Sequence, residues 1–223
     1  MTVGLFGGTF NPVHWGHVRT ALEIKKALQL TRMLLVPCGS PPHREQPDVN
    51  SEMRLAMLKA AIEGFAGLEI DDRELQRVGP SYTVDTLQSL HDELPGQSLV
   101  LCVGVDAFLH LDTWHRWQDL FIFSHIVVAH RPGWSMESLA DKASKELQTE
   151  IENRYITNSE QLTQQLSQKK AGSILELNVT QIDISSSDIR QRIQNDEQIS
   201  DLMPEGVVEI IQQNNLYREV KGN

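Results

Sequence analysis

Apolar runs and segments of helical periodicity alternate along most of this chain. Short apolar runs at residues 3–6, 33–38, 68–70, 99–105 and 126–129 predict five β-strands. Between them, apolar residues recur at three- and four-residue spacing from about Gly16, Ser51 and Ser81, which predicts a helix at each place. Residues 73–80 are expected to form a polar loop. This order of strands and helices predicts an α/β fold, a doubly wound parallel sheet of five or more strands with helices on both faces.

The second half of the chain departs from this alternation. Residues 134–172 are rich in Gln, Ser, Glu and Lys, and Leu139, Ala143 and Leu147 have helical spacing there. We expect a peripheral helical insertion with a solvated polar face, within a single domain of residues 1–223. Further on, Ser185 and Asp188 have the spacing of a capping box at the start of one more helix.

Composition narrows the functional classes. The chain of 223 residues has a formal net charge of -10. That charge argues against binding to nucleic acid or to a membrane surface, since both require a basic field. No apolar run approaches the ~20 residues of a membrane span, and no secretory signal pattern opens the chain, so we expect a cytoplasmic protein. Cys38 and Cys102 each lie in an apolar run, which favours buried free thiols. The oligomeric state stays open, a homo-oligomer included.

The first strand ends in a stretch typical of an anion site. Gly7 and Gly8 let the backbone pass close to a ligand, and the helix that follows begins between His14 and His17. A helix N-terminus offers unpaired N–H groups and a partial positive charge. The alternative is that the two histidines only cap a turn or bind a metal. The stretch lacks the Gly-Lys-Ser/Thr of a P-loop and the spacing of a dinucleotide fingerprint.

Other chemically distinctive residues also follow predicted strands. Pro41 to Arg44 follow the second strand, Gly104 to Asp106 close the fourth, and Arg131 follows the fifth. The carboxyl ends of parallel strands form the ligand crevice of such a sheet, so we expect these groups to meet at one rim.

These motifs together resemble a known family. They comprise residues 7–17, 41–44, 80–83, 104–106, 113–117, 130–133 and 184–190. In this order they are similar to the bacterial nicotinate mononucleotide adenylyltransferases, of the nucleotidylyltransferase superfamily with its His-x-Gly-His motif. Asn11 and Ser187 depart from the residues common in that family. The resemblance implies a Rossmann-like fold and an enzyme of NAD biosynthesis that joins nicotinate mononucleotide to the AMP part of ATP, releasing pyrophosphate.

The resemblance also implies roles for particular residues. Those with catalytic roles are His14, His17 and Arg190. ATP would contact Gly7, Gly8, Thr9, Phe10, His14, His17, Asp106, Arg131, Ser185, Ser186 and Arg190, and the mononucleotide would contact His43, Arg44, Tyr82, Thr83 and Trp114. Mg²⁺ would be bound through ATP phosphates and water, without a protein ligand. The backbone N–H groups of the helix that starts near Ser81 would bind the pyridine carboxylate, favouring the acid over the amide.

Several alternatives remain at this point. The acceptor could instead be nicotinamide mononucleotide or pantetheine phosphate, and the chain could be a noncatalytic sensor that binds ATP at the same loop. Trp114, Trp117 and Phe121 have the spacing of an apolar helical stripe, which is typical of core. The resemblance assigns pyridine stacking to Trp114 and leaves Trp117 in the core.

Overall fold

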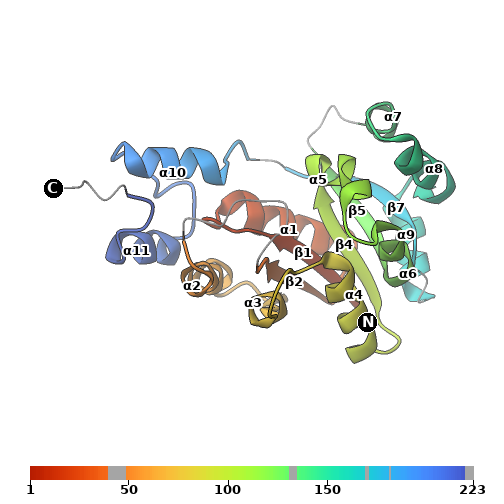
Figure 1. The fold of residues 1–223 in the computed structure, drawn as a ribbon, viewed down its shortest axis with the longest axis horizontal. Helices are drawn as coiled ribbons and strands as arrows, with labels where there is room; N and C mark the ends of the chain where they lie inside the picture. Colours follow the sequence, from red (N-terminus) through yellow and green to blue (C-terminus); the bar gives the residue numbers. More distant parts are fainter. Residues whose placement is uncertain (40–48, 131–134, 169–170, 181, 219–223) are drawn as a thin grey trace.

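The computed structural model describes residues 1–39, 49–130, 135–168, 171–180 and 182–218. Within these ranges, seven parallel strands form one sheet in the order β3-β2-β1-β4-β5-β7-β6 (Figure 1). The strands are β1 (Thr2–Gly8), β2 (Arg32–Pro37), β3 (Leu68–Ile70), β4 (Ser98–Gly104), β5 (Ser124–His130), β6 (Tyr155–Ile156) and β7 (Ile174–Asn178). The predicted doubly wound parallel sheet is confirmed.

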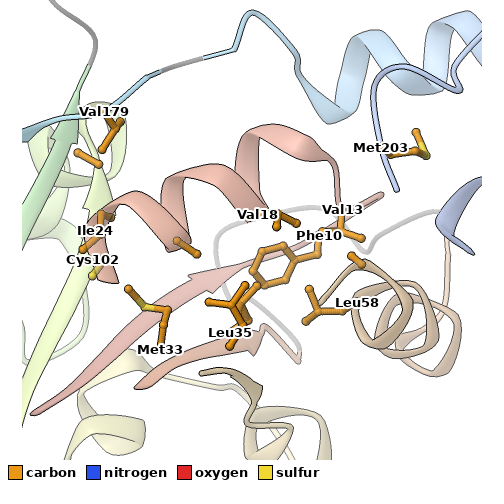
Figure 2. Close-up of a cluster of buried hydrophobic side chains, with 14 of the residues drawn as sticks. Phe10, Val13, Val18, Ile24, Met33, Leu35, Leu58, Cys102, Val179 and Met203 are labelled. Atoms are coloured by element: carbon orange, nitrogen blue, oxygen red, sulfur yellow. The ribbon is translucent and has the colours of Figure 1, made fainter. Parts of the chain in front are cut away.

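Helices cover both faces of the sheet because successive strand residues point to opposite sides. One face carries α1 (Trp15–Ala27), α2 (Ser51–Ile62), α9 (Ser159–Ser167), α10 (Ser186–Gln194) and α11 (Glu205–Gln213). The other carries α4 (Thr83–Glu93), α5 (Val105–Leu109), α6 (Leu120–Phe123), α7 (Met136–Ala140) and α8 (Lys145–Arg154). In β4, Val100 and Cys102 pack toward the first group and Leu101 toward the second. Figure 2 shows part of the first core, with Phe10 close to Val18, Leu35 and Leu58.

Two local expectations were wrong. The polar loop at residues 73–80 begins with a short helix, α3 (Arg73–Gln76), which buries Glu74. Trp114, Trp117 and Phe121 do not form one helical stripe. Trp114 follows a 3₁₀ turn (Leu111–Thr113), and Trp117 begins another (Trp117–Asp119), after Arg116 in the left-handed region at φ 49°. That left-handed residue interrupts the helical path.

The polar segment expected as an insertion contributes to the core and to the sheet. Its described residues form α7, α8, β6 and α9, and β6 pairs with β7 at the edge of the sheet. Leu147 and Ile151 of α8 are buried on one face of the sheet, while Leu162 and Leu166 of α9 are buried on the other. The helices are therefore amphipathic, with their polar residues facing solvent.

The two cysteines differ in environment. Both are free thiols, as expected, and Cys102 is buried, which raises the pKa of its thiol to about 12. Cys38 is only partly buried, because it follows the end of β2 where the sheet opens onto the rim. As for membrane association, none of the helices in the described ranges is long and apolar enough to cross a bilayer.

Candidate active site

The loop after β1 is anchored by an aromatic side chain. Phe10 has a φ of 49° and is only 1% exposed. Its ring points into the core beneath α1, as Figure 2 shows, so its side chain is not available to a ligand. With this anchor in place, Gly7, Gly8 and Thr9 pass along the carboxyl end of the sheet and line a cavity there.

The two histidines predicted at the helix start lie against each other. His14 is the N-cap of α1, and the ring centroids of His14 and His17 are 3.8 Å apart. The backbone N–H of His14 donates to Nδ1 of His17 at 3.3 Å. A Cβ on residue 16 would lie 2.9 Å from the His14 ring, so the glycine between the histidines makes room for it. This explains the His-x-Gly-His spacing in steric terms.

Both imidazoles are neutral in the free protein at pH 7. Burial lowers the pKa of His14 to about 4. Burial, and secondarily the charge of His14, lower the pKa of His17 well below its usual value. Since Nδ1 of His17 accepts a hydrogen bond, the proton of the neutral ring is on Nε2. His17 therefore offers one N–H donor at the start of α1, and a bound anion would favour its protonation.

The start of α10 is held against the same loop. Nη1 of Arg190 donates to the carbonyl of Asn11 at 2.8 Å, and Oγ of Ser186 donates to the carbonyl of Pro12 at 2.9 Å. Oγ of Ser185 accepts from the N–H of Asp188 at 3.1 Å, which confirms the predicted helix cap. The structure thus brings the starts of α1 and α10 together, and helix N-termini are suited to binding anions.

A cavity of about 290 Å³ lies at the carboxyl ends of β1, β2 and β4. Of the predicted site residues, Gly7, Gly8, Thr9, Tyr82, Thr83 and Trp114 line it. His14, His17, Ser185, Ser186 and Arg190 are not among the lining residues; they lie at the two helix starts beyond Thr9. The predicted site residues are therefore spread along the rim of the sheet. The helix starts follow the Gly7–Thr9 loop, and aromatic rings line another part of the cavity.

The aromatic end of the cavity is built from two segments. The rings of Tyr82 and His115 lie 4.3 Å apart with an interplanar angle of 35°, and Trp114 lines the same end. Trp117 is only 9% exposed and packs edge-on against Phe121 at 6.2 Å. Trp114 is thus the tryptophan available to a ligand, and Trp117 belongs to the core.

Helix α4 directs its start toward this end of the cavity. Tyr82 is the N-cap with φ -109° and ψ 135°, and Thr83 is the first helical residue. No hydrogen bond in the described ranges involves the N–H of Thr83 or of Val84. Tyr82 and Thr83 line the cavity, and unpaired N–H groups at a helix start are suited to binding an anion such as a carboxylate.

A buried carboxyl group lies in the same wall. Glu74 is 8% exposed, lines the cavity, and accepts a hydrogen bond from Oγ1 of Thr86 at 2.8 Å. Burial raises the pKa of Glu74, while the Thr86 hydrogen bond and the charge of Arg77 oppose that effect. Protonation of Glu74 would reduce its repulsion of an anionic ligand next to α4.

The remaining predicted residues are placed as follows. Asp106 is exposed in α5, directly after β4, and is not part of the cavity wall. His43, Arg44 and Arg131 lie outside the described residues. Glu74, Thr86 and His115 line the cavity without having been predicted. Only His115 carried a signal, since it lies between Trp114 and Arg116 in one of the quoted motifs.

Comparison with known proteins identifies the family of the chain. Residues 5–192 match the family model described as cytidylyltransferase-like. A protein of Methylococcus capsulatus named "probable nicotinate-nucleotide adenylyltransferase" is 42% identical over 216 residues, which are 96% of this chain and 99% of that protein. A protein of Cellvibrio japonicus with the same name is 43% identical over 218 residues, 97% of this chain and 99% of that protein.

A solved structure has the same fold. Plasmodium falciparum nicotinic acid mononucleotide adenylyltransferase complexed with NaAD has a TM-score of 0.71 at 16% identity, covering 97% of each chain. The fold is therefore of the Rossmann-like class. The chain belongs to the cytidylyltransferase-like family and, within it, to the nicotinate-nucleotide adenylyltransferases.

Proposed function

We propose that this protein is a nucleotidyltransferase that transfers the adenylyl group of ATP to nicotinate mononucleotide. The products are nicotinate adenine dinucleotide and pyrophosphate, and the reaction is a step of NAD biosynthesis. The observation that carries the proposal is a single cavity whose wall includes both the Gly7–Thr9 loop and the start of α4. The first is the loop that leads into α1, whose start is held against that of α10, and the second suits a pyridine carboxylate.

The proposed reaction requires the two substrates to be aligned, and it needs no nucleophile from the protein. The 5′-phosphate of the mononucleotide attacks the α-phosphorus of ATP, and the bond to pyrophosphate breaks. Catalysis then consists of holding two anions in line and stabilising charge on the α-phosphate oxygens. In this proposal His14 and His17, at the positive end of the α1 dipole, bind the α-phosphate. Arg190 and the start of α10 bind the departing pyrophosphate.

The acid end of the substrate is bound by backbone. A carboxylate accepts charge-assisted hydrogen bonds from the N–H groups of Thr83 and Val84 and gains from the dipole of α4. A carboxamide would present its NH₂ to donors and leave hydrogen bonds unmade. Trp114 at the same end provides a ring for stacking on the pyridine.

The donor chemistry of the described residues fits a Mg²⁺ ion bound through the substrate. No group of three or more His, Cys, Asp or Glu side chains suited to a metal occurs in the described ranges. Mg²⁺ favours phosphate oxygens and water, and ATP would supply the former. The ion would neutralise part of the triphosphate charge. The residues that hold the triphosphate around it are His14, His17 and Arg190.

The test is pyrophosphate release from ATP and Mg²⁺ with three acceptors assayed in parallel. These are nicotinate mononucleotide, nicotinamide mononucleotide and pantetheine phosphate. We expect release with the first acceptor at a kcat/KM at least about 30-fold above that with the second, and none with the third. Mass spectrometry of the product should find nicotinate adenine dinucleotide. Equal rates for acid and amide would contradict the acid preference, and ATP binding without release would indicate a sensor.

A further inference from the structure

An arginine of α2 is buried directly behind the Gly7–Thr9 loop. Arg54 is only 2% exposed and is the largest fully buried side chain in the described ranges. Its Nη1 donates to the carbonyl of Thr9 at 2.8 Å, and its Nη2 donates to the carbonyl of Cys38 at 2.9 Å. Thr9 follows β1 and Cys38 follows β2, so one guanidinium joins the carboxyl ends of two neighbouring strands.

The charge of Arg54 has no counter-ion in the described residues. Both of its acceptors are neutral carbonyl oxygens, its Nε has no hydrogen-bond partner, and no ion pair involves it. Arg73 provides the contrast, because its guanidinium pairs with Asp71 at 2.8 Å and with Glu93 at 2.9 Å. A buried cation without a counter-ion destabilises a protein unless an anion approaches it.

The cavity in front of Arg54 is where such an anion would bind. Thr9 and Cys38, whose carbonyls it holds, both line that cavity. A phosphate bound at the Gly7–Thr9 loop would therefore lie across the loop from the guanidinium. Its negative charge would compensate the buried positive charge, and the fixed carbonyls would keep the loop in one geometry for it.

We propose that Arg54 is a positioning residue for the nucleoside triphosphate. It acts through the carbonyls of Thr9 and Cys38, which fix the Gly7–Thr9 loop relative to the end of β2. Its charge, which no carboxylate among the described residues neutralises, also makes triphosphate binding more favourable than the loop alone would. The inference rests on the proposed function for the identity of the anion, and it goes beyond that proposal by assigning this buried residue a role in ATP affinity.

The experiment measures ATP binding by calorimetry without an acceptor, in wild type and in three variants. Arg54→Met keeps the length of the side chain and removes the charge, and Arg54→Lys keeps the charge with fewer donors. Arg32→Met is the matched control, because Arg32 lies at the opposite end of β2, partly exposed and paired with Glu69 at 3.1 Å. Both Met variants therefore change the net charge equally. Thermal unfolding of each free protein shows that the variants are folded.

Arg54→Met should weaken ATP binding by roughly tenfold or more, as expected for one unit charge near an anion at the effective dielectric of protein sites. Arg32→Met should stay within about twofold of wild type, and Arg54→Lys should regain most of the affinity. The affinity for nicotinate mononucleotide should change by less than about threefold in Arg54→Met, since its carboxylate end lies at α4. An equal loss for both ligands, or equal behaviour of Arg54→Met and Arg32→Met, would overturn the proposal.

If Arg54→Met does not fold, Arg54→Lys decides. The proposal then requires near-normal ATP affinity together with a kcat lowered by roughly tenfold, because one ammonium group cannot hold both carbonyls in the same geometry. An unchanged kcat would refute the positioning role. Measuring ATP binding separately from ATP turnover also distinguishes failure of the proposed adenylyl transfer from failure of the proposed role of Arg54. A wild type that binds ATP without transferring it would contradict the adenylyl transfer, while the effect of Arg54 on ATP affinity would still be measured.

Discussion

At the scale of single residues, the site is built from neutral imidazoles. Burial holds both His14 and His17 in their neutral form, so neither brings a fixed positive charge to the free site. The hydrogen bond from the His14 N–H to His17 Nδ1 sets the tautomer of His17 instead. His17 is thus prepared as an N–H donor that gains strength when negative charge develops next to it.

His17→Ala should lower kcat by about 10²–10³, the usual loss for one donor to charge that develops in the transition state. KM for ATP should change much less, because the interaction strengthens only as the reaction proceeds. Steady-state kinetics with nicotinate mononucleotide measures both constants. His91→Ala, a change at an exposed residue of α4, is the control. A near-normal kcat in a variant with native circular dichroism would contradict the role of His17.

The lowered pKa of His14 predicts a specific dependence of stability on pH. Between about pH 4 and pH 6.5 the unfolded chain binds a proton at His14 that the folded protein does not. The free energy of unfolding should therefore rise with pH across this window, with up to about 3 kcal/mol from His14. That contribution is complete above pH 6.5 and is lost as the pH falls toward 4. Urea unfolding of wild type and His14→Gln from pH 4.5 to 7.5 measures it, since the variant should show a flatter profile.

At the scale of elements, the proposed function depends on where three helices begin. The starts of α1 and α10 are joined through the Asn11 and Pro12 carbonyls, and the start of α4 faces the far end of the cavity. All three helices follow or neighbour the carboxyl ends of parallel strands, so their N-termini converge on the same rim. In the proposed function, this convergence lets a protein with a net charge of -10 bind polyanionic substrates through local groups.

The acid preference can be tested at the first residue of α4. Thr83→Pro removes one N–H that makes no hydrogen bond within the described residues. Proline is well tolerated at a first helical position, and the extended conformation of Tyr82 suits a residue before proline. We therefore expect an intact helix and the loss of most of the ~30- to 1000-fold preference for the acid, in ratios of kcat/KM. Thr83→Ala should keep much of it. An unchanged preference for the acid in Thr83→Pro would show that the carboxylate does not bind at the start of α4.

The start of α10 predicts a different selectivity. Arg190→Ala should raise KM for ATP, and for pyrophosphate in the reverse reaction, by roughly 10-fold or more, since a charge-assisted contact is lost. KM for nicotinate mononucleotide should hardly change. Arg190→Lys should recover only part of the loss because it cannot reproduce a planar fork. Arg192→Ala, at an exposed position of the same helix, is the control. A larger effect on KM for the mononucleotide than on KM for ATP would show that Arg190 contacts the mononucleotide instead.

The sequence predicted elements better than it predicted contacts. The five expected strands are confirmed, and so are the starts of α1 and α4. Their apolar periodicity could be recognised because it is set by burial against the sheet. Strand β7 was missed, since Ile174, Leu175 and Leu177 give only a short apolar run among polar residues. Arg54 was missed for a different reason. A charged residue in a helix is usually solvent-facing, and the carbonyls that hold Arg54 come from loops distant in sequence.

The buried side of α2 shows the same limit. The apolar spacing predicts an inner face of Met53, Ala56, Met57, Ala60 and Ala61, and Met57 and Ala61 are buried as expected, together with Arg54 and Leu58. Met53 and Ala60 pack against the same core while partly buried, so the buried face extends to Arg54, which the apolar pattern did not indicate. Tertiary contacts decided the orientation, because two strand ends offered acceptors to a guanidinium.

At the scale of the whole molecule, the end of the chain stabilises the loop near its beginning. The hydroxyl of Tyr217 donates to Oδ1 of Asn11 at 2.8 Å, and the carbonyl of Leu202 accepts from the N–H of Trp15 at 3.0 Å. Helix α11 lies beside α2 in Figure 1, and its apolar residues belong to the same core as Phe10. The segment around Asn11 is thus held from the C-terminal side as well as by Phe10. This arrangement gives Asn11 a structural role through its amide side chain.

Tyr217→Phe should couple a loss of stability to a loss of ATP affinity. The variant leaves the buried Oδ1 of Asn11 without its Tyr217 donor, which should lower the free energy of unfolding by about 1–3 kcal/mol. For a chain of this size, each kcal/mol corresponds to roughly 2–4 °C in Tm. The loop before α1 also loses one of its tethers, so KM for ATP should rise by about three- to tenfold while KM for the mononucleotide stays nearly constant.

Tyr155→Phe separates these two effects. Tyr155 donates to Glu176 at 2.7 Å from the edge strand β6, so its change also removes one hydroxyl hydrogen bond, but far from α1 in the order of the sheet. It should lower Tm without changing KM for ATP. Differential scanning calorimetry and steady-state kinetics on both variants give the comparison. If Tyr217→Phe lowered Tm and left KM for ATP unchanged, the C-terminal segment would stabilise the fold without positioning the phosphate loop. The contact between Tyr217 and Asn11 would then be unrelated to catalysis.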